Sequence, residues 1–369
     1  MGKTSQTNPG GLFKMKVAIV HDDLVQWGGA ERVLQGICEV FPEAAIYTSV
    51  FDRSNKRLSE AFKDKKIITS FLQKIPGWKL LYKLLLPFYA IAFEQFNFDN
   101  FDLVISHTTR LAKSIITKPE TKHICLCHTP PRFLWHFSGE KNYGLGELLL
   151  TKLRIFDQVS AKRVDCFLAG SKNAQRRIKK IYKVESRVLY PFIDLGRFKN
   201  LTSFDGGYLV VVSRLNKYKR VDIAIAACIE LNIPLKVVGT GSQIEYLKSL
   251  DKKDQVQFLG NINESLLDLV LSGAKALLIP GEEDFGLVSL EAQALGKPVI
   301  AFGKGGSLET IVDNKTGIFF EIQTKDAMVD AIKRFELMKI NASDCREMAA
   351  KFSKEIFSKK LKEQIAQVM

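Results

Sequence analysis

The sequence predicts an α/β protein made of two doubly wound, Rossmann-like parallel-sheet domains in tandem. Its length of 369 residues suits two domains, and 46% apolar with 25% charged residues is the composition of a globular chain. Short runs that are apolar on both faces of a strand alternate with helical patterns, which is typical of a parallel sheet covered by helices on each side. The alternation stops at an extended stretch near residue 190 and then restarts, so two such sheets are expected.

The first domain is expected at residues 15–188, after a leader (1–14) that we expect to be disordered. A buried strand at 16–21 leads through a polar loop into a helix that begins near Gly28-Gly29-Ala30-Glu31 and is apolar on one face. Further buried strands, separated by helical stretches, are expected at 45–50, 102–106, 123–127 and 164–170.

The second domain, expected at 189–350, begins with an extended connector, because the residue before Pro191 is disfavoured in a helix. Residues 351–369 are expected to form a separate terminal helix. Between the connector and this terminal helix, the pattern predicts strands at 208–213, 235–239, 256–259, 274–279 and 298–302. It also predicts helices at 221–231, 265–272 and 287–295.

The excess of positive charge lies in the first half of the chain. The sequence has 54 Lys and Arg against 40 Asp and Glu; residues 15–188 hold 28 basic and 17 acidic residues, whereas 189–369 hold 24 and 23. We therefore expect the first domain, with its net charge of +11, to meet an anionic surface. A uniformly basic nucleic-acid-binding protein would not need this asymmetry, so nucleic acid is not an expected partner.

Composition and the N-terminus favour a cytoplasmic protein. No stretch of 18 uncharged apolar residues predicts a transmembrane helix, and the N-terminus lacks the apolar segment of a secretory signal. The six cysteines are scattered through apolar segments, as expected of reduced, buried thiols rather than a disulfide framework.

Residues 281–292 carry the strongest functional signal. This stretch follows a strand, turns at a glycine and continues as a helix, so the amides of 285–287 would point at an anion. Glu283 and Glu291 are separated by eight residues, about 12 Å along a helix, which suits one ligand with a polar group at each end. The alternative is a capped helix with a solvated acidic turn.

A second signal follows the first strand of the second domain, where open α/β sheets bind ligands. In the stretch 212–220, Arg214 offers a planar fork of donors and Lys219 a mobile point charge, a pair well suited to a diphosphate. A solvated basic loop is the alternative.

These motifs occur in an order that resembles a known family. Arg214 and Lys219 precede Gly239-Thr240-Gly241, Phe258-Leu259-Gly260 and the Glu283/Glu291 motif, and the first half adds Gly28-Gly29-Ala30-Glu31-Arg32 and Cys127-His128-Thr129-Pro130-Pro131-Arg132. Over residues 16 to about 350 the combination resembles the retaining glycosyltransferases of family four, and especially bacterial mannosyltransferases of polysaccharide assembly. The resemblance implies the GT-B fold, with two domains facing a cleft, the donor mainly in the second domain, and the terminal helix crossing back to the first.

The resemblance also implies a role for each motif. Arg214 and Lys219 would bind the donor diphosphate and stabilise its charge as it departs. Glu291 would hold the nucleotide ribose, Glu283 would touch the transferred hexose, and His128 would lie beside the primary hydroxyl of that hexose. The other donor-binding residues would be Gly28, Gly29, Gly239, Ile262, Glu264, Phe285, Gly286 and Leu287, and the acceptor side would carry Arg132, Trp135 and His136.

Several of these residues have a structural alternative. Glu264 could accept hydrogen bonds from guanine, which favours a GDP-sugar, or cap the following helix. His128 could be a core histidine or a zinc ligand with Cys125 and Cys127, although no second cluster in sequence completes such a site. Arg132 could be a structural ion-pair partner. No Asp-x-Asp motif lies near the site, so we expect no metal or other cofactor.

Residues 76–93 combine two lysines, no acidic residue and five aromatic residues with a long apolar face. This composition predicts a helix lying in a membrane interface. Trp78, Tyr82, Leu85 and Tyr89 would insert, and Lys79 and Lys83 would face the lipid. The alternative is a core helix whose lysines extend outward.

The sequence therefore predicts a retaining hexosyltransferase, peripheral on the inner face of the membrane. It would move mannose from GDP-mannose to a lipid-linked or glycan acceptor, with departure of the diphosphate and attack of the acceptor hydroxyl on the same face. A UDP-sugar is the alternative donor. An epimerase or phosphorylase of the same fold, and a basic nucleic-acid-binding protein, are the alternative classes.

Overall fold

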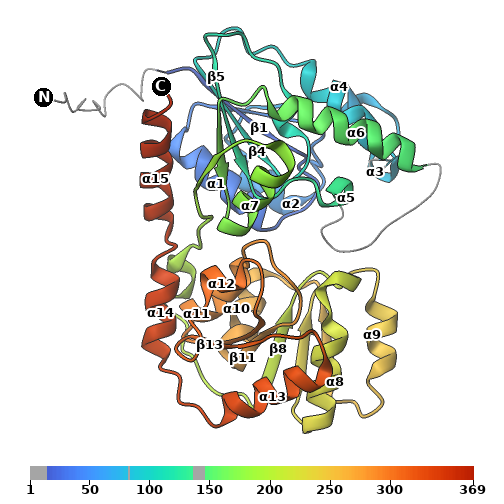
Figure 1. Cartoon of the computed structure of the whole chain (residues 1–369), viewed down its shortest axis with the longest axis vertical. Helices are drawn as coiled ribbons and strands as arrows, with labels where there is room; N and C mark the ends of the chain where they lie inside the picture. The colour runs from blue at the N-terminus through green and yellow to red at the C-terminus, as the bar shows by residue number, and fades with distance from the viewer. Residues whose placement is uncertain (1–14, 82–83, 136–145) are drawn as a thin grey trace, which may run out of the picture. The chain divides into compact units, whose positions relative to one another are not determined.

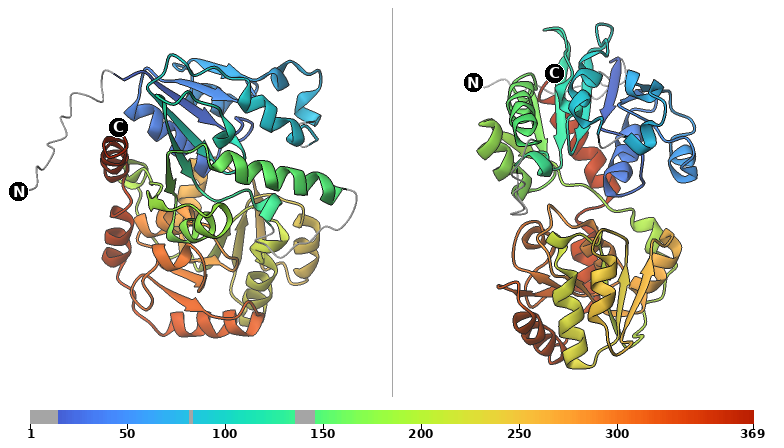
Figure 2. Two further views of the ribbon diagram at one scale, coloured as in Figure 1. Left: turned by 45° about the horizontal axis from the view of Figure 1, so that its top comes forward. Right: turned by 90° about the vertical axis from the view of Figure 1, so that its right-hand side faces the viewer.

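The computed structural model describes residues 15–81, 84–135 and 146–369, which form two compact units. The first unit extends to Tyr190 and also contains Phe357–Met369, and the second is Pro191–Ile356. Each unit is a parallel sheet with helices on both of its faces (Figures 1 and 2). The expected leader, Tyr82, Lys83 and His136 lie outside the described residues.

The first unit contains a seven-stranded parallel sheet in the order β3-β2-β1-β4-β5-β6-β7. Its strands are β1 (Val17–His21), β2 (Ala45–Thr48), β3 (Ile67–Thr69), β4 (Leu103–Thr108), β5 (Lys122–Cys127), β6 (Cys166–Ala169) and β7 (Ser186–Val188). Its helices are α1 (Gly29–Val40), α2 (Lys56–Ala61), α3 (Trp78–Leu81), α4 (Tyr89–Glu94), α5 (Arg132–Trp135), α6 (Gly146–Ala161), α7 (Lys172–Tyr182) and most of α15 (Lys354–Ala366), with 3-10 turns η2 (Phe71–Lys74), η3 (Leu86–Phe88) and η4 (Ala112–Ser114). The strand order reverses between β1 and β4, the point at which such sheets bind ligands.

The second unit contains a six-stranded parallel sheet in the order β10-β9-β8-β11-β12-β13, which reverses between β8 and β11. Its strands are β8 (Tyr208–Val212), β9 (Leu235–Val238), β10 (Val256–Gly260), β11 (Ala274–Ile279), β12 (Val299–Phe302) and β13 (Gly317–Phe320). Its helices are α8 (Val221–Leu231), α9 (Ile244–Leu250), α10 (Glu264–Ser272), α11 (Leu287–Ala294), α12 (Ser307–Thr310), α13 (Lys325–Glu336) and α14 (Ala342–Ala350), with 3-10 turns η5 (Leu195–Phe198) and η6 (Lys217–Lys219). Buried side chains of α8, α9 and α13 pack against one face of this sheet.

The doubly wound architecture predicted from the sequence is confirmed, and three further strands complete the sheets. All three, β3, β7 and β13, lie at a sheet edge, where a strand pairs with one neighbour only. Such strands need only a short run of residues, so β3 and β7, with three residues each, carry little periodic signal.

Residues 76–93 do not form one helix, and the prediction that Trp78, Leu85 and Tyr89 insert into a membrane is wrong. The segment is broken into α3, η3 and α4, with Gly77 in a left-handed conformation and Pro87 in its middle. Trp78, Leu85 and Tyr89 are buried in the core of the first unit. Lys79 is exposed, and its Nζ lies 2.6 Å from Asp52 Oδ1. No helix in the described residues is long and apolar enough to span a bilayer.

Candidate active site

Two loops of the second unit meet where its strand order reverses. The loop after β8 ends in η6, and the loop after β11 carries Glu283; Lys219 Nζ lies 2.5 Å from Glu283 Oε1. Gly281 permits this approach, since a Cβ there would lie 2.8 Å from the Cα of Lys219. The two strongest sequence motifs therefore form one polar site, as their places at the carboxyl ends of adjacent strands require.

Glu283 lies in the loop before α11 rather than on the helix, so the expected helical separation from Glu291 does not apply. Its backbone oxygen accepts a hydrogen bond from the amide of Gly306, 2.8 Å away. Gly286 caps the helix with φ of +93°, and the first turn opens at Leu287, as the sequence predicted. The side chain of Phe285 is buried and packs against Phe352, so only its backbone can serve a ligand.

Glu291 lies on α11 and is buried beside a residue that sequence reasoning missed. Arg197, in η5, places Nη1 3.2 Å from Glu291 Oε1 and Nη2 2.6 Å from Asp268 Oδ1. Burial would lower the pKa of Arg197, but the carboxylates of Glu291, Asp268 and Glu264 outweigh it and raise that pKa. No motif marks Arg197, which directly follows the connector in a short turn.

The other residues expected to bind the donor lie around these loops. Arg214 is exposed, and its guanidinium makes no ion pair with any residue that the structure describes. Gly239, at the end of β9, has φ of +127°, and a Cβ there would lie 1.9 Å from the Ser213 oxygen. Ile262 precedes Asn263, whose side chain caps α10. Glu264 is therefore not the cap; its Oε1 lies 3.9 Å from Arg197 Nη1.

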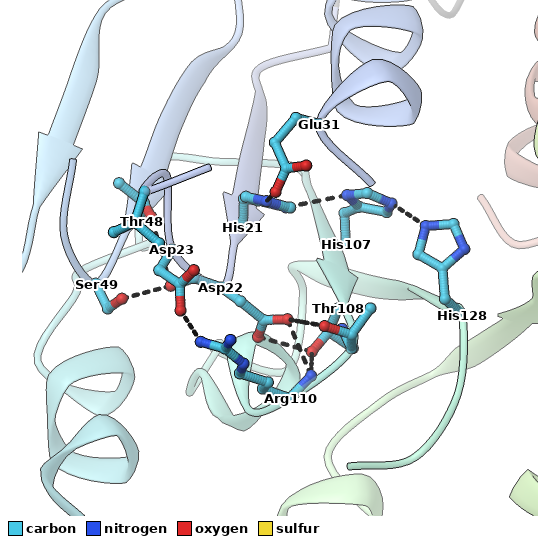
Figure 3. A network of polar contacts seen from close by, with 12 residues as sticks. His21, Asp22, Asp23, Glu31, Thr48, Ser49, His107, Thr108, Arg110 and His128 are labelled. Atoms are coloured by element: carbon cyan, nitrogen blue, oxygen red, sulfur yellow. Dashed lines mark hydrogen bonds and ion pairs between the residues drawn. The ribbon is translucent and has the colours of Figure 1, made fainter. Parts of the chain in front are cut away.

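The first unit places a separate polar network where its own strand order reverses (Figure 3). Asp22, just after β1, is buried, and its carboxylate accepts hydrogen bonds from the backbone amides of residues 109–112 at 2.6–2.9 Å. It also accepts from Thr108 Oγ1 at 2.8 Å. Asp23 forms an ion pair with Arg110. Asp22 thus fixes the turn that follows β4.

Three histidines and Glu31 form a chain beside this turn. His21 Nδ1 lies 3.0 Å from His107 Nδ1, and His107 Nε2 lies 2.5 Å from His128 Nε2. On the other side, His21 Nε2 lies 3.7 Å from Glu31 Oε1. Figure 3 shows the three rings in a row from β1 through β4 to the end of β5. Sequence reasoning singled out His128 but not its partners, which belong to strands that are far apart along the chain.

Burial and neighbouring charges separate the pKa values of these histidines. Burial alone would lower the pKa of His21, but the hydrogen-bonding interaction and charge of Glu31 and the charges of Asp22 and Asp23 raise it above its usual value. Burial, reinforced by repulsion from the two neighbouring rings, holds the pKa of His107 well below its usual value. Positive charge in the chain is therefore favoured on His21 and disfavoured on His107.

The other expected residues of the first unit lie near this network or on α5. Gly28 is the N-cap of α1 and Gly29 its first residue, and a Cβ on Gly28 would lie 3.3 Å from Glu31 Oε2. Arg132 and Trp135 bound α5, and Trp135 Nε1 donates to Asp157 Oδ2 at 2.8 Å. Asp157 also forms a fully buried ion pair with Lys113. The indole of Trp135 is thus anchored by a core carboxylate.

The described residues contain no group of three or more His, Cys, Asp or Glu side chains placed to hold a metal ion. In particular, Nε2 of His128 faces His107 rather than Cys125 or Cys127.

Comparison with known proteins covers both halves of the chain. The family model described as Glycosyltransferase Family 4 matches residues 27–197, and Glycosyl transferases group 1 matches residues 193–352. The alpha-1,3/1,6-mannosyltransferases ALG2 of Kluyveromyces lactis and Saccharomyces cerevisiae are 24% and 26% identical, over 82% and 81% of this chain and 72% and 71% of their own. The solved structure of sucrose-phosphate synthase from Thermosynechococcus elongatus superposes with a TM-score of 0.73 at 18% identity, over 96% of this chain and 99% of that one. With both halves matched and two doubly wound units present, the chain belongs to the family-four glycosyltransferases of the GT-B fold.

Proposed function

We propose that this glycosyltransferase transfers mannose, with retention, from GDP-mannose to a lipid-linked or glycan acceptor. The observation that carries the proposal is the meeting of Lys219 and Glu283 where the second sheet reverses. Lys219 is a cation that can hold a diphosphate, and Glu283 is a carboxylate that can accept hydrogen bonds from sugar hydroxyls. The two side chains are in contact, and Arg214 lies in the same loop as Lys219. The relatives named as mannosyltransferases support mannose as the sugar.

In this proposal, the chemistry rests on residues of this chain and needs no metal. Lys219, Arg214 and the amides that open α11 stabilise the charge that grows on the departing diphosphate. The departing phosphate oxygen takes the proton of the acceptor hydroxyl as that hydroxyl attacks from the same face. Glu283 and His128 contact the hexose, and Glu291, held by Arg197, contacts the ribose.

Donor binding tests this proposal most directly. A ligand that binds the folded state raises the unfolding free energy by about 2.7 kcal/mol at a hundred times its Kd. We expect GDP-mannose and GDP to raise the melting temperature more than UDP-glucose or UDP-galactose, and labelled mannose to be transferred to a polyprenyl-diphosphate-linked glycan. Lys219→Ala should lose the shift, whereas Lys217→Ala, which changes an exposed lysine of the same loop, should keep it. A shift with UDP-sugars alone would contradict the GDP-mannose assignment.

We further propose that the first unit docks on an anionic membrane through the segment 76–93. Its outward residues differ from those that the sequence suggested: Leu80 is 90% exposed, Leu84 73%, Ile91 57% and Phe88 49%. Four large apolar side chains exposed within one short segment are typical of an interaction surface. The net charge of +11 on residues 15–188 favours attraction of this unit to acidic lipid. Such docking would hold the enzyme on the membrane face that carries a lipid-linked acceptor.

A further inference from the structure

Glu31, His21, His107 and His128 form a chain of side chains, although contact with a sugar would require only His128. Three of its members are almost fully buried, at 4%, 3% and 0% exposure respectively, whereas His128 is partly exposed. The His21 and His107 rings are nearly parallel, with an interplanar angle of 18° and centroids 5.0 Å apart, and their Nδ1 atoms lie 3.0 Å from one another. The buried end holds a carboxylate and the partly exposed end a histidine assigned to the donor sugar.

The donors and acceptors along this chain are determined by the charge of one ring. A carboxylate only accepts, so the negative charge of Glu31, whose Oε1 lies 3.7 Å from His21 Nε2, favours a proton on that nitrogen. When His21 is neutral, its Nδ1 is therefore an acceptor, and His107 must donate from Nδ1. His107 Nε2 then accepts, and His128 donates from Nε2, which leaves His128 Nδ1 as an acceptor.

Protonation of His21 reverses the donor and acceptor at each of the two contacts between histidines. A charged His21 carries protons on both nitrogens, so its Nδ1 donates to His107 Nδ1. His107 then carries its proton on Nε2 and donates to His128 Nε2, and His128 carries its proton on Nδ1. The two states differ by one proton in total. A proton that binds His128 Nδ1 moves the Nε2 proton of His128 to His107, and the Nδ1 proton of His107 to His21.

We propose that Glu31, His21 and His107 form a proton relay that lets His128 take up or release a proton at Nδ1 while its own ring stays neutral. The inference deepens the proposed function and rests on it only for the assignment of His128 to the sugar. The proton enters or leaves at the partly exposed ring, and the positive charge resides on His21. His21 and His107 are positioning residues in this scheme, because they act through His128.

The surroundings of His21 favour charge at that place. Glu31 faces it from α1, Asp22 and Asp23 follow it in the loop after β1, and His107 faces it from β4. Asp23 is partly neutralised by Arg110 of the turn after β4, and Asp22 by the amides of the same turn. The raised pKa of His21 and the lowered pKa of His107 agree with this distribution.

Nuclear magnetic resonance of the imidazole nitrogens tests the relay on the complete chain, which has five histidines. We expect His21 to gain its second ring proton as the pH is lowered from 9 to 5. His128 should exchange its proton from Nε2 to Nδ1 with the same midpoint and remain neutral. The relay is overturned if His128 becomes the cation, or keeps its Nε2 proton while His21 is charged.

Two variants extend the test beyond the wild-type titration. Glu31→Gln removes the charge beside His21 and should lower the shared midpoint by about 1–3 pH units. His123→Gln is the matched control: His123 is also fully buried, on β5, but bonds Ser106 Oγ instead of the chain, so the midpoint should not change. If Glu31→Gln leaves the midpoint in place, the relay is excluded.

A kinetic measurement links the relay to catalysis. Glu31→Gln should shift the acid limb of the pH profile of kcat/KM by the same interval, with KM for the nucleotide sugar little changed; a merely structural defect would lower activity without moving the profile. The titration of ring nitrogens needs no substrate. A failure of GDP-mannose as donor would therefore leave the relay test intact, and a failed relay would leave the donor assignment intact.

Discussion

Lys219 and Glu283 neutralise one another in the second unit, so a bound diphosphate has to compete for the lysine. The competition favours the transition state, because the charge on the leaving phosphate grows as the sugar bond breaks and strengthens its attraction for the cation. The pair is only slightly exposed, with 11% and 18% of its side chains accessible, which reduces screening by solvent.

We expect Arg214→Ala and Lys219→Ala to lower the rate of transfer by about 10²–10³, the loss caused by removing one contact to developing charge. Lys217→Ala should remain within a few-fold of the wild type. Steady-state transfer of labelled mannose at saturating acceptor measures both effects. Near-normal activity of either Arg214→Ala or Lys219→Ala would refute the diphosphate assignment.

Replacing Glu283 and Glu291 by alanine should impair different properties of the enzyme. Glu291→Ala should chiefly weaken nucleotide binding, since a ribose contact is equally strong in ground and transition states. The variant should fold, because Arg197 keeps Asp268 and Glu264 as partners. Glu283→Ala should chiefly lower kcat. Calorimetric titration with GDP, run beside turnover measurements, separates the two; weaker GDP binding only in Glu283→Ala would reverse the assignment.

The burial of His123 predicts how the free energy of unfolding depends on pH. Burial lowers the pKa of His123 to about 3, whereas an unfolded histidine has a pKa near 6.5. The unfolded chain therefore binds a proton that the folded chain refuses, and the free energy of unfolding falls as the pH drops from about 6.5 towards 3. Urea denaturation at pH 7 and pH 4.5 should show a smaller loss for His123→Gln than for the wild type. An equal loss in both proteins would contradict the lowered pKa.

The residues of the site were predictable where they belong to contiguous motifs. Arg214, Lys219 and Glu283 follow strands in recognisable patterns, and the pattern places them at the same sheet edge. Arg197 and His107 were not predictable, because each acquires its partners through the register of the fold rather than through neighbours in sequence. Strand pairing between residues 17–21 and 103–107 is what brings His21 opposite His107.

At the scale of elements, the segment 76–93 shows how composition can indicate a surface while misplacing its residues. A single helix would put Trp78, Leu85 and Tyr89 on one face, and the sequence assigned that face to the membrane. The breaks between α3, η3 and α4 turn these three side chains into the core. The outward surface instead contains Leu80, Leu84 and other aliphatic and aromatic groups.

Replacement of Leu80 and Leu84 by glutamate should therefore reduce binding to vesicles that contain anionic lipid, without unfolding the protein. The matched control is Leu337→Glu with Ile322→Glu, which changes two leucine- or isoleucine-sized side chains of 88% and 65% exposure in the second unit. Binding should also weaken as salt rises, since the Debye length at physiological ionic strength is about 8 Å. Equal sedimentation of both double variants with vesicles would show that this segment does not face lipid.

The central strands of both sheets were predictable because they are buried on both faces and form continuous apolar runs. Helix α8 begins and ends at the predicted residues, and β11 does so too. The edge strand β10 was also predicted, but β3, β7, β13 and the breaks in 76–93 were not, because short edge strands have weak periodicity and the breaks depend on tertiary packing.

At the scale of the whole molecule, the chain passes from the first unit to the second once and returns once. The terminal helix predicted at 351–369 is α15, most of which belongs to the first unit, and α14, just before it, lies in the second. Phe357, Leu361 and Ile365 form the buried face of α15, with exposures of 2% or less. Each buried side chain of this size contributes about 1.5–3 kcal/mol.

A chain that ends at Ile356 should consequently lose much of the stability of its first unit while the second unit remains folded. Differential scanning calorimetry should show one transition retained and still raised by GDP, and a second transition lowered or lost. Truncation after Gln367 is the control, since it spares all three buried side chains and the hydrogen bond that Arg187 donates to Gln367 Oε1. An unchanged thermogram for the shorter chain would contradict the role given to α15.

The return of α15 also bears on how the protein is made. A ribosome releases residues 15–190 first, but the unit that they form still lacks a helix until residues 357–369 have been synthesised. The second unit is continuous in sequence, so all of its residues are available while the first unit still lacks residues 357–369. Synthesis therefore begins with the first unit, but the second unit receives its last residue before the first does. Nascent chains stalled between residues 330 and 356 should expose to chaperones and proteases the surface that Phe357, Leu361 and Ile365 later cover.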